Sequence, residues 1–133
     1  MLDEKPVKPE ILCPVKETLK ILGKRWTILI IKDIYYSPQK KLGFMELRKL
    51  LVEVSPKVLS ERLKEMAEHN LISKKVIAET TPVRVEYALT DKGADAVTII
   101  NNMKKYGLKW AKDGEFDCEK KDCEICTQER LKK

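Results

Sequence analysis

One segment of the sequence, from Arg25 to Tyr36, is apolar on almost every side when it is drawn as a helix. Its apolar residues are Trp26, Ile28, Leu29, Ile30, Ile31 and Ile34. A helix of this kind must be enclosed by other elements, so it predicts the centre of a folded core. The run is too short to cross a bilayer, which needs roughly 20 apolar residues. The rest of the chain is therefore expected to supply amphipathic elements that cover this helix.

The residues before the central helix predict an arm and a short amphipathic helix. Pro6 and Pro9 oppose helix formation, so residues 1–12 are expected to form an extended arm. Pro14 suits the first turn of a helix, and Gly23 suits its end. The apolar stripe of this helix consists of Val15, Leu19 and Leu22.

A pair of helices joined by a tight turn follows the central helix. Lys40–Leu42 is predicted to be a short strand, and the apolar spacing of Phe44–Leu51 predicts a helix. Ser55 is a good N-cap and a proline follows it, so a second helix is predicted over Pro56–Glu68. The buried face of this second helix is predicted to be Leu59, Leu63 and Met66.

A hairpin and a long helix complete the pattern. Ile72–Glu79 is rich in β-branched residues and Val83–Leu89 alternates, so these segments predict two paired strands. Thr90 is the predicted N-cap of one long final helix. The apolar positions of that helix are Val97, Ile100, Met103, Tyr106 and Trp110. From residue 113 the pattern stops, and an acidic tail with cysteines begins.

This order of elements predicts an α+β fold that is mostly helical. Two helices joined by a tight turn and followed by a hairpin form the winged helix-turn-helix layout. The additional N- and C-terminal helices are not needed to read DNA, so we expect them to form a dimer. The predicted organisation is an arm at 1–12, a winged-helix and dimerisation domain at 13–112, and a tail at 113–133.

Charge and composition favour a polyanionic partner over catalysis. The formal net charge is +6, although residues 113–133 are net acidic. A basic body suits nucleic acid. The single histidine, His69, and the lack of a glycine-rich phosphate loop offer no convincing catalytic group, so no enzyme activity is expected. The first ten residues lack the apolar core of a signal peptide, and a cytoplasmic location without membrane attachment is expected.

The helix over Pro56–Glu68 is the predicted reader of double-stranded DNA, because an α-helix fits the major groove. Its exposed face and tip are predicted to carry Ser55, Lys57, Ser60, Glu61 and Lys64. The two lysines can reach guanine acceptors or phosphates, whereas Glu61 either accepts from cytosine or orients a lysine. The alternative is a protein-interaction winged helix without sequence-specific DNA binding, and Glu61 is the one residue on this face that favours it.

Three further cations are predicted to contact DNA outside the reading helix. Arg48, on the preceding helix, suits phosphate contact, and Lys74 on the hairpin is expected to face the DNA backbone. Arg84, at the predicted wing, is long enough to enter a minor groove. For Lys74, as for any other lysine on this surface, an ordinary solvent-exposed charge is an equally good interpretation.

Several short motifs between Leu12 and Trp110 together resemble the HxlR-type winged-helix transcriptional regulators, which are relatives of the MarR family. The motifs are Cys13-Pro14-Val15, Gly23-Lys24-Arg25-Trp26-Thr27, Phe44–Arg48, Ser55–Leu63, Pro82–Tyr87 and Leu89–Gly93. The resemblance implies cytoplasmic homodimers that bind pseudo-palindromic operators through the helix at 55–68. Two features depart from the family: Gly-Gly-Lys-Trp is usual where this chain has residues 23–26, and many members end soon after the final helix.

Cys13 is a candidate sensor of redox or electrophile stress. The positive end of a helix dipole favours thiolate, and this cysteine precedes Pro14 at a predicted helix start. Several members of the family it resembles respond to oxidants, quinones or aldehydes through a cysteine that precedes a proline near the N-terminus. The alternative is a small residue that packs in the dimer interface.

The cysteines of the tail are a second open question. Cys118, Cys123 and Cys126 have a spacing that also occurs in zinc and iron–sulfur sites. A fourth cysteine ligand could come only from Cys13 within this chain. The alternatives are a disulfide between Cys123 and Cys126, or a reduced tail without structure, so no cofactor is required by the predicted function.

Overall fold

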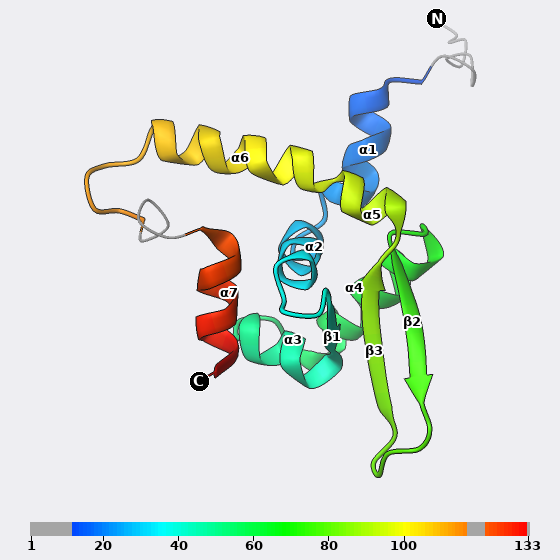
Figure 1. The fold of residues 1–133 in the computed structure, drawn as a ribbon. Coiled ribbons are helices and arrows are strands. Elements are labelled where there is room, and N and C mark those ends of the chain that lie inside the picture. Colours follow the sequence, from blue (N-terminus) through cyan, green and yellow to red (C-terminus); the bar gives the residue numbers. More distant parts are fainter. Residues whose placement is uncertain (1–11, 117–121, 133) are drawn as a thin grey trace, which may run out of the picture.

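The computed structural model describes residues 12–116 and 122–132. The sheet has three strands, and Figure 1 shows helices packed around its upper part while the hairpin projects below them. In chain order the elements are α1 (Pro14–Leu22), α2 (Thr27–Tyr35), β1 (Lys41–Gly43), α3 (Phe44–Leu50), α4 (Pro56–Glu68), β2 (Ile72–Ile77), β3 (Arg84–Leu89), α5 (Asp91–Asp95), α6 (Val97–Lys109) and α7 (Cys123–Lys132). The predicted α+β class with a winged helix-turn-helix is confirmed.

Helix α2 forms the centre of the core, as its composition predicts. Ile30, Ile31 and Ile34 have no solvent exposure, and α2 contacts α1, α3, α5, α6, β1 and β3. The predicted start at Arg25 is wrong by two residues. Trp26 has a φ of 83°, in the left-handed region, so the helical backbone begins only at Thr27.

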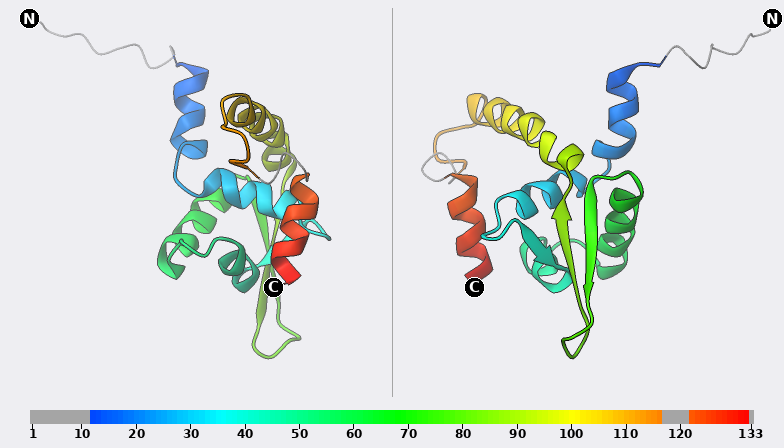
Figure 2. Two further views of the ribbon diagram at one scale, coloured as in Figure 1. Left: turned by 90° about the vertical axis from the view of Figure 1, so that its left-hand side faces the viewer. Right: turned by 45° about the vertical axis from the view of Figure 1, so that its right-hand side comes forward.

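The sheet has the antiparallel strand order β1-β3-β2, and its hairpin projects beyond the core. Strand β1 begins at Lys41 rather than the predicted Lys40, because Lys40 adopts a left-handed φ of 56°. The β1–β3 ladder ends at the pair Gly43↔Glu86, whereas the β2–β3 ladder continues to Ile77↔Arg84. Both views in Figure 2 show the tip of this hairpin extending past the helices as a wing.

The predicted long final helix is wrong in one respect: it is two helices, α5 and α6. At the end of α5 the Ala96 N–H bonds to the carbonyl of Gly93, three residues back, which tightens the turn. Gly93 is held close to the carbonyl of Leu71, where an added Cβ would lie 2.1 Å from the oxygen. Helix α5 therefore docks on the start of the hairpin, and α6 runs across α2 at the end of the molecule opposite the wing tip (Figure 1).

The predicted tail includes a helix that the sequence pattern did not reveal. Helix α7 begins after Asp122, whose carboxylate accepts a hydrogen bond from the Ile125 N–H at 2.8 Å. It packs against α3, and its Thr127 side chain is buried. Within the described residues, no helix is both long and apolar enough to cross a membrane.

One buried carboxylate lies in α2. Asp33 is 1% exposed, and its Oδ1 accepts no hydrogen bond from the described residues. Lys32 Nζ lies 3.4 Å from that oxygen as an ionic neighbour. Burial raises the pKa of Asp33, while the charges of Lys32 and Arg130 oppose the shift. The folded protein therefore favours the neutral acid more than the unfolded chain does.

We expect Asp33→Asn to stabilise the protein at neutral pH by about 1 kcal/mol, because it removes a poorly solvated charge. The folded-state pKa of Asp33 lies above its unfolded value. The wild type therefore loses stability as the pH rises between those two values, and the variant does not. The gain should shrink toward zero as the pH falls below that window. Urea unfolding of both proteins between pH 4 and pH 8 measures the difference in their free energies of unfolding. A difference that is equal at pH 4 and at pH 8 contradicts a raised pKa of Asp33 as its cause.

Candidate nucleic-acid interface

Local chemistry sets the position and limits of α4, which spans the predicted range Pro56–Glu68. The Ser55 hydroxyl accepts a hydrogen bond from the Val58 N–H at 3.1 Å, and a proline occupies the first helical position. Asn70 ends the segment with a left-handed φ of 62°. The predicted buried face is confirmed, since Leu59, Leu63 and Met66 are all buried.

The opposite face of α4 is open to solvent. Lys57, Ser60, Glu61 and Lys64 are exposed, and their side chains form no hydrogen bond or ion pair with another described residue. Ser55 differs from them, because its hydroxyl caps the helix. A helix with two unpaired ammonium groups beside a small hydroxyl can approach base edges or phosphates closely.

Ion pairs fix α4 to the loop between α1 and α2. Glu65 accepts hydrogen bonds from Lys24 Nζ at 2.9 Å and from Arg62 at 3.1 Å. The same arginine donates through Nε to the carbonyl of Arg25 at 3.1 Å. The Lys24 hydrogen bond is the main cause that lowers the pKa of Glu65. These contacts lie on the side of α4 toward the body, so they orient the helix without using its open face.

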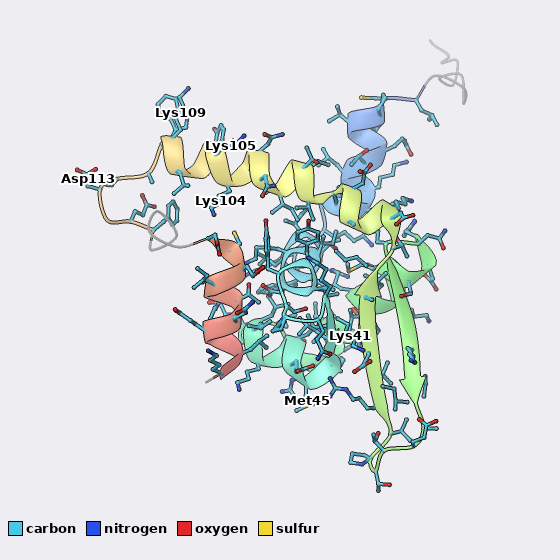
Figure 3. The ribbon with its side chains drawn as sticks, viewed as in Figure 1. Lys41, Met45, Lys104, Lys105, Lys109 and Asp113 are labelled. Atoms are coloured by element: carbon cyan, nitrogen blue, oxygen red, sulfur yellow. The ribbon has the colours of Figure 1, made fainter. Side chains whose placement is uncertain are left out.

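Helix α3, which precedes the turn, contributes one open cation. Arg48 is exposed and has no side-chain partner within 12–116 and 122–132. Its neighbour Lys49 donates instead to the carbonyl of Leu131 in α7 at 2.9 Å. Figure 3 shows Lys41 and Met45 on the part of β1 and α3 that faces the base of the wing. Met45 is 67% exposed, so this part of α3 is not covered by another element.

The wing carries two of the predicted contacts in different environments. Lys74 is exposed on β2, without a partner in the described part of the chain. Arg84 is instead held by two carboxylates: its NH2 lies 2.7 Å from Glu46 Oε1 and its Nε lies 3.0 Å from Glu86 Oε2. These hydrogen bonds raise the pKa of Arg84 and lower that of Glu86. Its entry into a minor groove stays a prediction.

Sequence reasoning missed Glu46, although a local signal was present. Glu46 lies three residues after Gly43, which is the spacing of an N-terminal helix cap. Its Oε1 accepts from the Gly43 N–H at 2.8 Å. The pairing with Arg84 joins residues far apart in the sequence, and no local pattern predicts it.

The described cysteines, Cys13, Cys123 and Cys126, lie outside α4 and the wing. Cys13 is exposed at the N-cap of α1. Cys123 begins α7, and its Sγ lies 3.4 Å from Lys104 Nζ of α6 (labelled in Figure 3). Cys118 lies outside the described residues, and within them no group of three candidate metal ligands is gathered. The metal hypothesis for Cys118, Cys123 and Cys126 stays a prediction.

The arrangement defines the class of protein. A capped reading helix, a preceding helix and a projecting wing together form a winged helix-turn-helix, which binds duplex DNA. A model of the HxlR-like helix-turn-helix family matches residues 21–115. The chain belongs to this family, and it is a DNA-binding transcriptional regulator. Family membership supports this function over the protein-interaction alternative.

Relatives agree with this assignment. The chain is 39% identical over 100 residues to YvaP of Bacillus subtilis, an uncharacterized HTH-type transcriptional regulator, covering 74% of this chain and 89% of YvaP. It is 34% identical over 109 residues to YodB of the same organism, also an HTH-type transcriptional regulator, covering 81% of this chain and 94% of YodB.

Solved structures are similar as well. A putative MarR-family regulator from Porphyromonas gingivalis W83 has a TM-score of 0.68 and 32% identity, covering 81% of this chain and all of that one. The reduced form of YodB has a TM-score of 0.64 and 30% identity, covering 79% of this chain and all of that one. YodB is also solved after diamide treatment and with bound quinone, with TM-scores of 0.60 and 0.62.

We expect Lys64→Ala to weaken binding to a selected DNA site while the protein stays folded. A base contact would be worth about 1–3 kcal/mol, and a phosphate contact would reduce the salt slope of the affinity by about 1. Fluorescence anisotropy at several salt concentrations measures both quantities. Lys112→Ala, which removes an equal charge from the exposed loop after α6, is the control. Equal affinity of the two variants contradicts the assigned face.

Proposed function

We propose that this protein acts as a homodimer that binds a pseudo-palindromic operator, with α4 of each protomer in the major groove. The open face of α4 carries the proposal: Lys57, Ser60 and Lys64 are exposed without side-chain partners among the described residues. Glu61 on the same face accepts from cytosine or orients a lysine. Arg48 and Lys74 contact phosphates on either side.

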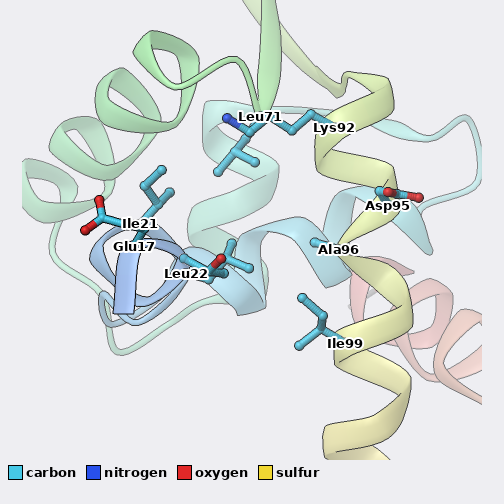
Figure 4. Close-up of a pocket in the computed structure, with 9 residues that line it drawn as sticks. Glu17, Ile21, Leu22, Leu71, Lys92, Asp95, Ala96 and Ile99 are labelled. Carbon is cyan, nitrogen blue, oxygen red and sulfur yellow. The ribbon is translucent and has the colours of Figure 1, made fainter. Parts of the chain in front are cut away.

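Unpaired apolar surface on α1 and α6 supports dimerisation. Several large apolar side chains on the two helices and at the C-cap of α6 are more than half exposed: Val15, Leu19, Met103, Tyr106 and Trp110. Exposed apolar side chains gathered on two neighbouring elements favour a protein interface. A groove of about 330 Å³ between α1 and the α5–α6 segment adds Ile21, Leu22 and Ile99 to this surface (Figure 4). A two-fold dimer through these helices leaves both wings free.

We expect Tyr106→Glu to shift the dimer toward monomer and to weaken operator binding at the same protein concentration. The new charge would be buried without a partner in the interface. Sedimentation equilibrium and a DNA-binding titration measure the two effects. Ile125→Glu is the matched control, because Ile125 is an exposed apolar residue of α7. A Tyr106→Glu protein that remains a dimer, or a monomer with wild-type affinity, would refute the proposed interface.

Cys13 is the proposed site at which a redox or electrophile signal acts. It is exposed at the start of α1, one of the proposed dimer helices, so a change in its thiol can alter how two protomers pair. Thiolates near a helix N-terminus are reactive. YodB, to which this chain is 34% identical, has been solved after diamide treatment and with bound quinone, which supports this proposal.

Diamide treatment should release the wild type from its operator and leave Cys13→Ser bound. The serine hydroxyl is nearly isosteric with the thiol and cannot be oxidised by diamide. The double variant Cys123→Ser and Cys126→Ser is the control, and it should still respond. An electrophoretic mobility shift assay measures binding before and after treatment. An equal loss of binding in Cys13→Ser and the wild type would exclude Cys13 as the sensor.

A further inference from the structure

A chain of charged side chains ties the wing to the helix-turn-helix. We call Lys41, Glu46, Arg84 and Glu86 the wing clamp. Arg84 NH2 contacts Glu46 Oε1 at 2.7 Å, and Arg84 Nε contacts Glu86 Oε2 at 3.0 Å. The other oxygen of Glu86 lies 3.6 Å from Lys41 Nζ. The clamp therefore joins β3 to β1 and α3, which adjoin each other but lie far from β3 in the sequence.

Glu46 joins the backbone of one element to the side chain of another. The carboxylate oxygen that binds Arg84 also accepts the Gly43 N–H at 2.8 Å, at the junction of β1 and α3. The fit around this junction is close, because an added Cβ on Gly43 would lie 3.2 Å from the Arg84 guanidinium. The position of Arg84 is thereby fixed relative to the first turn of α3.

The wing clamp lies at the point where β3 stops pairing with β1 and the hairpin begins to project from the core. The β1–β3 ladder ends at Glu86, so Arg84 lies beyond the last residue of β3 that pairs with β1. From that point β2 is the strand partner of β3. Residues 76–83, which form the rest of the wing, contain no lysine or arginine. The wing thus has Arg84 as its last cation before the tip, and this cation is already engaged.

The electrostatics of the clamp would oppose simple DNA attraction. Glu46 and Glu86 offset the charges of Arg84 and Lys41, so the clamp as a whole adds no net positive charge to attract phosphates. A guanidinium held by two carboxylates in charge-assisted hydrogen bonds is also less available to a base or phosphate. The two carboxylates therefore favour a role in positioning the wing over a role in attracting DNA by charge.

We propose that Glu46 and Arg84 are positioning residues, which set the direction of the wing relative to α4. Arg84 then acts through Glu46 rather than by reading the minor groove. The inference rests on the proposed function, because wing direction matters only when α4 and the wing engage the same DNA. Its consequence is that removal of an acid beside the DNA surface weakens binding.

A double-mutant cycle tests the clamp: Glu46→Gln, Arg84→Gln and their combination. Glu53→Gln is the matched control, since Glu53 is an exposed acid in the turn before α4 and has no described side-chain partner. Affinity for an operator selected by the wild type is measured together with hydroxyl-radical footprints. Thermal melting of each variant separates loss of the fold from loss of wing position.

Each single clamp variant should bind about tenfold more weakly, and the combination should bind no more weakly than the weaker single variant. Protection should be lost beside the wing and kept beside α4. The Glu53→Gln control should bind as tightly as the wild type or more tightly. Arg84→Lys keeps the attraction for phosphate and loses the planar fork, so it should also weaken binding.

Other results would overturn the proposal. If Glu46→Gln binds as tightly as Glu53→Gln, the carboxylate acts only as a like charge. If the losses of binding free energy in the two single variants add in the combination, Arg84 contacts DNA independently of Glu46. The same conclusion follows if Arg84→Lys keeps wild-type affinity. If the wild type selects no DNA at all, the proposed function fails and the clamp fails with it, whereas the other results contradict the clamp alone.

Discussion

Burial of α2 is the constraint on which the rest of the structure depends. Ile30, Ile31 and Ile34 are fully buried, and no single neighbour could enclose a helix that is apolar on almost every side. Elements from before and after it in the sequence pack around it: α1, α3, α5, α6, β1 and β3. Figure 1 shows the wing tip at one end of the molecule and α6 at the other, with α2 between them.

Charged contacts then fix the positions of α4 and the wing, which apolar packing alone does not determine. Glu65 with Lys24 and Arg62 holds α4 against the body, and its pKa is lowered by the same contacts. Glu46 with Arg84 holds the wing against α3. Both sets use long side chains that are partly exposed, so their contribution to global stability is small. We propose that their contribution to function is geometric, because they would hold α4 and the wing in position to meet one DNA surface together.

The sequence predicts those parts of the fold that local chemistry specifies. The limits of α4 follow from Ser55, Pro56 and Asn70, and its open face follows from the 3.6-residue period. The break at Ala96 and the docking of α7 depend on tertiary contacts, such as the approach of Gly93 to Leu71, and no local pattern carries them. For the same reason the sequence indicated Arg84 as a DNA contact but could not reveal its carboxylate partners.

The central claim is that α4 reads the major groove in two symmetry-related copies. A crystal structure of the protein with an operator selected from random DNA tests it most directly. We expect two α4 helices in successive major grooves, roughly 34–36 Å apart. We also expect Lys57, Ser60 or Lys64 to lie within hydrogen-bond distance of base edges or phosphates. A complex in which α4 faces solvent, or in which one protomer alone binds the site, would contradict the account.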